Sequence, residues 1–169
     1  MRDRQVAYHG DRGVPSTAWA AARQLARDYV LCARSTPTLL VEQRRTSAEL
    51  ITDLLGRLGF SDIEMTSSAE NALELLHQRK FGLVLADWDL EPMNGWQLLR
   101  AVRNDDRLRR TPFLMTAEHL SCDKAVLAKR TGVDALLLKP FRATALKTKL
   151  EQITNSRRMP WFGLNGPVH

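Results

Sequence analysis

The stretch Phe81–Asp89 constrains the fold more than any other part of the chain. It is almost entirely apolar and uncharged until it ends in Asp87-Trp88-Asp89. Such an unbroken run is typical of a parallel strand that is buried on both faces of a sheet. Ligand chemistry in open α/β sheets lies just beyond the carboxyl ends of such strands. The pattern therefore predicts a central strand and places Asp87 where a reacting carboxylate would lie, although an ordinary acidic turn after a strand has the same pattern.

Segments of strand and helix character alternate from residue 38 onward. Strands are expected at 38–41, 62–66, 81–86, 111–116 and 134–138, and helices at 44–58, 68–79, 95–103, 119–130 and 143–154. The inward face of the first of these helices is expected to carry Leu50, Leu54, Leu55 and Leu58. Five βα units with short connections predict an α/β fold, a doubly wound parallel sheet of five strands with five flanking helices.

Shifts in composition divide the chain into three parts. Residues 1–36 are expected to be an N-terminal extension with a helix at about 17–33. Residues 37–154 form the expected globular domain, and 155–169 a C-terminal tail. The helix at 17–33 has an apolar stripe that needs a surface to pack on. That surface belongs to its own domain, to a second copy in a homodimer, or to another partner.

The formal net charge of +6 is concentrated at the ends of the chain. Residues 1–36 carry six arginines against three acids, whereas residues 37–153 carry 17 basic against 16 acidic side chains. One local basic cluster consists of Arg103, Arg107, Arg109 and Arg110. Such a cluster would suit binding to a nucleic-acid phosphate backbone. Two aspartates interrupt that cluster, so a solvated loop explains it better than nucleic-acid binding.

Targeting and redox features are sparse. No apolar run approaches the roughly 18 residues of a membrane span, and the first residues lack the apolar region of a signal peptide. Cys32 and Cys122 do not have metal-ligand spacing. A cytoplasmic location without a membrane partner is the expectation.

Polar side chains follow four of the predicted strands where each strand ends. The first strand ends in Glu42-Gln43, the third in Asp87, the fourth in Thr116, and the fifth in Lys139. Because the carboxyl ends of parallel strands lie along one edge of a sheet, acids, a hydroxyl and an ammonium group are expected to converge there.

Four motifs around these strand ends occur in a familiar order and spacing. They are Leu85–Asp89, Pro92–Gly95, Leu114–Glu118 and Leu138–Phe141. With these motifs, residues 38–153 resemble the receiver domain of two-component response regulators, particularly the single-domain, CheY-like type. The resemblance implies a CheY-like fold and a role in phosphorelay signal transduction.

The resemblance also implies a reaction. Asp87 matches the phosphoacceptor of the family, which takes a phosphoryl group from a histidine kinase, a phosphotransfer protein or a small phosphodonor. Lys139 matches the lysine that neutralises the transferring oxygens, and Thr116 matches the hydroxyl that bonds the phosphoryl group when the domain switches. Such a protein is not an enzyme beyond self-catalysed phosphoryl transfer to Asp87 and hydrolysis from it.

A Mg²⁺ cofactor is implied in the same way. Its ligands would be Glu42, Asp87 and the backbone carbonyl of Asp89, with Gln43 as a further candidate. The family usually ends its first strand in two acids, and the neutral amide of Gln43 departs from that pattern. Because Mg²⁺ prefers charged, hard oxygens, this departure predicts weakened metal binding.

The expected output is a protein contact. The resemblance implies that a downstream target binds the 119–154 face. A second interpretation stays open, a phosphorylation-independent pseudo-receiver that acts as an interaction module. Gln43 favours it, and so does Leu136, which stands where the family often has a switching aromatic residue.

Overall fold

The computed structural model describes residue 20 and residues 35–157 of the 169-residue chain. One parallel sheet contains β1 (Thr38–Val41), β2 (Ile63–Thr66), β3 (Leu83–Asp87), β4 (Phe113–Ala117) and β5 (Ala135–Leu138). The strand order is β2-β1-β3-β4-β5. The helices of residues 35–157 are α2 (Arg45–Arg57), α3 (Ala69–Gln78), α4 (Gly95–Asn104), α5 (Cys122–Thr131) and α6 (Ala143–Arg157). The predicted doubly wound architecture is confirmed.

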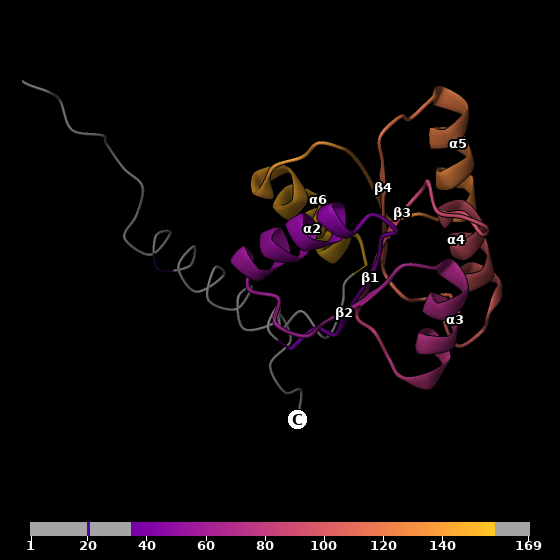
Figure 1. The fold of residues 1–169 in the computed structure, drawn as a ribbon, viewed down its shortest axis with the longest axis horizontal. Coiled ribbons are helices and arrows are strands. Elements are labelled where there is room, and N and C mark those ends of the chain that lie inside the picture. The colour runs from indigo at the N-terminus through magenta and orange to yellow at the C-terminus, as the bar shows by residue number, and fades with distance from the viewer. Residues whose placement is uncertain (1–19, 21–34, 158–169) are drawn as a thin grey trace, which may run out of the picture.

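The helices form two layers on the sheet. Helices α2 and α6 cover one face, and α3, α4 and α5 cover the other (Figure 1). Each layer has its own buried cluster of aliphatic and aromatic side chains against the strands. Because both faces of β1, β3 and β4 are covered, these strands are buried at every position and do not alternate, whereas the edge strand β2 is partly exposed.

Strand β3 lies at the centre of this arrangement. All five of its residues are buried, and it pairs with β1 on one side and β4 on the other. The register places Asp87 directly beside Thr116 of β4. The topology therefore delivers the acid and the hydroxyl to the same point of the sheet edge.

Side-chain caps fix where three helices begin. The Ser68 hydroxyl accepts a hydrogen bond from the backbone N–H of Asn71 at the start of α3. Asn94 and Gln97 form a reciprocal capping box at the start of α4. Ser121 caps α5 in the same manner as Ser68, so this helix begins at Cys122 rather than at the predicted residue 119. Residues 118–120 are thereby left in a loop at the sheet edge.

The prediction that Leu50 faces inward is wrong. Its side chain is 58% exposed, whereas Ala48, Ile51 and Leu55 form the buried face of α2. The cause is that the apolar positions of this helix cover more than one face, and a helix can turn only one stripe toward the sheet. Leu50 thus remains as an apolar side chain on the surface.

Two further predictions, the helix at 17–33 and the tail 155–169, fall on segments that lie mostly outside the described residues. Helix α6 continues to Arg157 instead of ending at the predicted residue 154. Among the described residues, no helix has the length and apolar character needed to cross a membrane.

Candidate functional site

The carboxylate of Asp87 is the centre of the site. It lies at the end of β3 and is only 2% exposed. The hydroxyl of Thr116 donates a long, 3.5 Å hydrogen bond to its Oδ1 atom, and Nζ of Lys139 lies 3.1 Å from the same oxygen. The predicted acid, hydroxyl and ammonium group therefore meet, as their positions at strand ends required.

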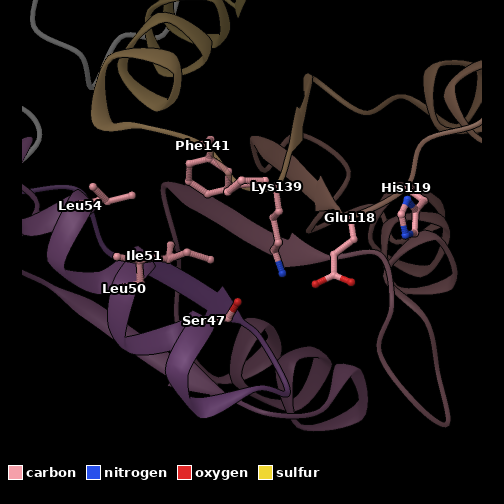
Figure 2. Close-up of a pocket in the computed structure, with 9 residues that line it drawn as sticks. Ser47, Leu50, Ile51, Leu54, Glu118, His119, Lys139 and Phe141 are labelled. Carbon is pink, nitrogen blue, oxygen red and sulfur yellow. The ribbon is translucent and has the colours of Figure 1, made fainter.

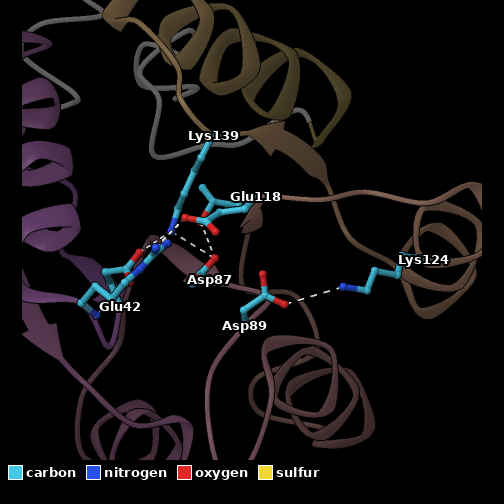
Figure 3. Close-up of polar contacts among 8 residues, drawn as sticks. Glu42, Asp87, Asp89, Glu118, Lys124 and Lys139 are labelled. Atoms are coloured by element: carbon cyan, nitrogen blue, oxygen red, sulfur yellow. Dashed lines mark hydrogen bonds and ion pairs between the residues drawn. The ribbon is translucent and has the colours of Figure 1, made fainter.

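Glu42 joins this group from the end of β1. Its side chain is buried and forms an ion pair with Lys139, so one ammonium group lies between two carboxylates (Figure 3). Its other oxygen accepts a 3.0 Å hydrogen bond from the backbone N–H of Arg44. The two acids therefore share the charge of Lys139.

The pKa of Asp87 is raised above its ordinary value. Burial is the largest cause, because the charged form loses its hydration. The ammonium group of Lys139 opposes the rise, and the negative charge of Glu42 adds to it. The site is therefore short of positive charge when Asp87 is ionised.

The side chains of Gln43 and Asp89 both point away from the buried acids, although the proposed ligand of Asp89 is its backbone carbonyl. The side chain of Gln43 is exposed to solvent and does not join the buried group. Asp89 turns its carboxylate toward α5, where its Oδ1 lies 3.6 Å from Nζ of Lys124. The same ammonium group is 5.2 Å from the ring centroid of Trp88, which is within cation–π range. Lys124 thus links α5 to the loop after β3.

Sequence reasoning did not select the ion pair between Arg44 and Glu118. The guanidinium Nη1 of Arg44 contacts the carboxylate of Glu118, and both side chains are about half exposed. The signal was present in the chain, since Arg44 follows β1 closely and Glu118 comes directly after β4. Loop residues next to the polar strand ends are therefore candidates as well as the strand-end residues themselves.

Helix α4 approaches the site through a glycine. A Cβ atom at Gly95 would lie 2.1 Å from the backbone oxygen of Asp87, which is far inside van der Waals contact. The backbone N–H of Gly95 also donates a 3.0 Å hydrogen bond to the carbonyl of Trp88. The absence of a side chain at Gly95 therefore allows the loop after β3 to fold back tightly.

A pocket of about 380 Å³ opens beside Lys139. Its apolar wall includes Leu50 and Leu54 of α2 and Phe141, while Glu118 and Lys139 lie at its polar end (Figure 2). Leu50 is exposed because its side chain faces this pocket next to the site.

Arg103 does not belong to a solvated basic cluster. Its guanidinium pairs with Asp134 at 2.9 Å, and both side chains are largely buried. It also donates to the backbone carbonyls of Thr111 and Gly132 at 2.8 Å. The interpretation of residues 103–110 as one basic loop therefore needs correction, because Arg103 joins α4 to the strands and cannot face a phosphate backbone.

The donor set suits a magnesium ion that keeps most of its water. Glu42 and Asp87 provide two hard carboxylate oxygens near each other, and Mg²⁺ is commonly held by one or two carboxylates and several waters. In residues 35–157 no group of three or more acids, histidines or cysteines is arranged to hold a metal. Glu42 and Asp87 therefore fit a Mg²⁺ ion whose remaining ligands are mostly water.

The fold and the convergence of an acid, a hydroxyl and a lysine at one sheet edge agree with the arrangement that the receiver-domain resemblance implies. The profile of the response regulator receiver domain matches residues 38–151. The chain accordingly belongs to the response regulator receiver family and is CheY-like. Receiver domains are signalling modules of two-component systems rather than conventional enzymes, and histidine kinases are their partners there.

Individual relatives agree with this assignment. The chain is 37% identical over 115 residues to the chemotaxis protein CheY of Pseudomonas aeruginosa, covering 68% of this chain and 93% of that protein. The solved structure of CheY4 from Vibrio cholerae has a TM-score of 0.65 at 24% identity, with 70% of this chain and 98% of the other covered.

A metal-containing relative adds a comparison for the cofactor. The receiver domain of the sensor histidine kinase PA1611 from Pseudomonas aeruginosa has a TM-score of 0.63 at 20% identity, covering 76% of this chain and 98% of that domain. Its structure has a magnesium ion coordinated in the active-site cleft. Receiver domains typically bind Mg²⁺, which agrees with the chemistry of Glu42 and Asp87.

Proposed function

We propose that this protein is a single-domain response regulator that accepts a phosphoryl group on Asp87 and signals through protein contact. The observation that carries the proposal is the convergence of Asp87, Thr116 and Lys139 at one sheet edge. A cytoplasmic location and a histidine kinase or phosphotransfer protein as donor are part of the same proposal.

The chemistry follows from the contacts of Asp87. A carboxylate oxygen of Asp87 attacks phosphorus, the bond from phosphorus to the donor breaks, and the donor leaves with the electron pair. Lys139 neutralises charge on the phosphoryl oxygens, while the hydroxyl of Thr116 changes its acceptor from the carboxylate to a phosphoryl oxygen. Glu42, Asp87 and the backbone carbonyl of Asp89 would hold a Mg²⁺ ion, and such an ion would supply positive charge to the phosphoryl oxygens.

The downstream surface is proposed to be the 119–154 face. Its apolar side chains Val126, Leu127 and Leu138 are exposed, which suits a protein partner. Two connections lead there from the site, namely Thr116 at the end of β4 and the pair of Lys124 with Asp89. Leu136 is half-buried against the core, so the switch is proposed to work without the aromatic residue common in the family.

A titration of the purified protein with Mg²⁺ tests the proposal, with and without beryllofluoride as a mimic of the acyl phosphate. The fluorescence of Trp88 is the signal, because this buried ring directly follows Asp87. We expect a saturable change at millimolar Mg²⁺ that beryllofluoride enhances. Asp87→Asn is the control, since it keeps all four tryptophans and removes only the acceptor carboxylate.

The same titration distinguishes the second candidate function. The exposure of Gln43 and the engagement of Glu42 by Lys139 favour a pseudo-receiver that binds partners without phosphorylation. A flat response in the unaltered protein, matching that of Asp87→Asn, would favour this alternative and count against phosphoacceptance.

A further inference from the structure

The ion pair of Arg44 and Glu118 spans the candidate site. Arg44 lies in the loop after β1 and Glu118 in the loop after β4, and β3 lies between these two strands. The pair therefore passes above the end of β3, where Asp87 is located. In Figure 3 the carboxylate of Glu118 lies on the side of Lys139, whose charge acts on it.

The carboxylate of Glu118 lies among cations in this position. Arg44 holds it directly, and Arg44 is itself anchored because its backbone N–H donates to Glu42. The hydrogen bond from Arg44 lowers the pKa of Glu118, and the charges of Lys139 and His119 contribute in the same direction. An internal anion thus occupies the cationic side of the opening through which a phosphodonor would reach Asp87.

We propose that Arg44 binds the phosphoryl oxygens of an incoming acyl phosphate, and that Glu118 occupies Arg44 in the resting state as an internal competitor. The inference rests on the proposed phosphoacceptor role of Asp87. A guanidinium is suited to this exchange because its planar donors match carboxylate and phosphate oxygens equally well. The positive charge of Arg44 also compensates for the weakened Mg²⁺ binding that the neutral side chain of Gln43 predicts.

The transfer step is balanced without any further reactant when the donor is acetyl phosphate. An oxygen of Asp87 forms the new bond to phosphorus, and the bond from phosphorus to the acetate oxygen breaks. The electron pair leaves with acetate. Arg44 only exchanges partners, from the carboxylate of Glu118 to the phosphoryl oxygens, and no covalent bond of its side chain changes.

The test measures the rate at which acetyl phosphate labels the protein, followed by intact mass at increasing donor concentration. Glu118→Gln should lower the donor concentration for half-maximal rate by about two- to fivefold, the range expected for removing one exposed ion pair. Arg44→Met should raise it by about tenfold, because a charged hydrogen bond to the donor is lost. Arg44→Lys should restore part of that loss.

A double variant and a charge control make the result specific. Arg44→Met combined with Glu118→Gln should behave like Arg44→Met alone, since a competitor has no effect once its binding residue is gone. Glu91→Gln removes a charge from an exposed acid in the loop after β3 and should leave the half-maximal concentration unchanged. Thermal melts should show all variants folded, because both altered side chains are about half exposed.

Failure of this inference can be told apart from failure of the proposed function. Labelling at Asp87 that is equally fast in Glu118→Gln and the unaltered protein would overturn this inference alone. The same holds if Glu91→Gln gives an equal gain, or if the gain persists without Arg44. No labelling of the unaltered protein, as in Asp87→Asn, would overturn both.

Discussion

At the scale of single residues, the buried acid Asp87 determines how the site behaves. Its carboxylate shares one lysine with Glu42 and has little access to water. Burial raises the pKa of Asp87, so its ionised form is less favourable in the folded chain than in the unfolded chain. The fold therefore disfavours the ionised form of the residue that is proposed to react.

The raised pKa of Asp87 predicts that the stability of the protein depends on pH. Between the ordinary pKa of an aspartate and the raised pKa of Asp87, the folded state binds more protons than the unfolded state, so stability falls as pH rises through this window. Asp87→Asn removes the titration. As pH rises through this window, the free energy of unfolding of the Asp87→Asn variant should increase relative to that of the unaltered protein. The difference should persist at neutral pH.

Urea unfolding of both proteins between about pH 3 and pH 8 without Mg²⁺ measures this difference. The dependence on urea should have the same slope in both proteins, which shows that only the stability has changed. A stability difference that stays constant with pH, or that moves in favour of the unaltered protein as pH rises, would contradict the prediction.

At the scale of elements, the start of α4 packs directly against the end of β3. A Cβ atom at Gly95 would meet the backbone oxygen of Asp87 at 2.1 Å, and main-chain atoms have little room to yield. We expect Gly95→Ala to lower the free energy of unfolding by about 3 kcal/mol or more, because either the helix or the end of β3 must move. Chemical denaturation measures the loss.

Gly56 provides the matched control. It lies in α2, is exposed, and has open space around the position of a Cβ atom. Gly56→Ala should stabilise the protein by about 0.5–1 kcal/mol, because alanine loses less conformational freedom in a helix than glycine does. Equal effects of the two substitutions would mean that the crowding at Gly95 has no energetic importance.

Much of the fold and of the site could be predicted from the sequence, for reasons that lie in particular elements. The apolar run of β3 and the polar residues at strand ends follow local patterns, so they placed Asp87, Thr116 and Lys139 correctly at one edge. The roles of these residues stay predictions until labelling tests them. The orientation of Leu50 could not be predicted, because it depends on which stripe of α2 meets the sheet.

Contacts between side chains of distant loops could not be predicted from local sequence patterns. Arg103 was grouped with its sequence neighbours, yet its partner Asp134 comes from the segment before β5. Likewise, the partner of Arg44 is 74 positions away, from residue 44 to residue 118. A periodic pattern describes which residues face a sheet, but it contains no information about which loops meet above the sheet edge.

At the scale of the whole molecule, the described residues 35–157 contain two hydrophobic clusters and the side chains named above for the candidate site. We therefore expect a chain of residues 35–157 to unfold in one cooperative transition, with a melting temperature within about 5 °C of the full chain. Differential scanning calorimetry of the two proteins measures this. A much larger decrease would show that the stripe at 17–33 contributes to the core.

The pair of Glu42 and Lys139 joins positions that are 97 residues apart. A ribosome releases the chain from its amino end, at roughly 5–20 residues per second, so Glu42 and Asp87 emerge well before Lys139 does. Until β5 leaves the exit tunnel, the two acids at the sheet edge lack the ammonium group that they share. A nascent or prematurely ended chain therefore lacks the complete candidate site, and the proposed acceptor function would arise only with the last strand.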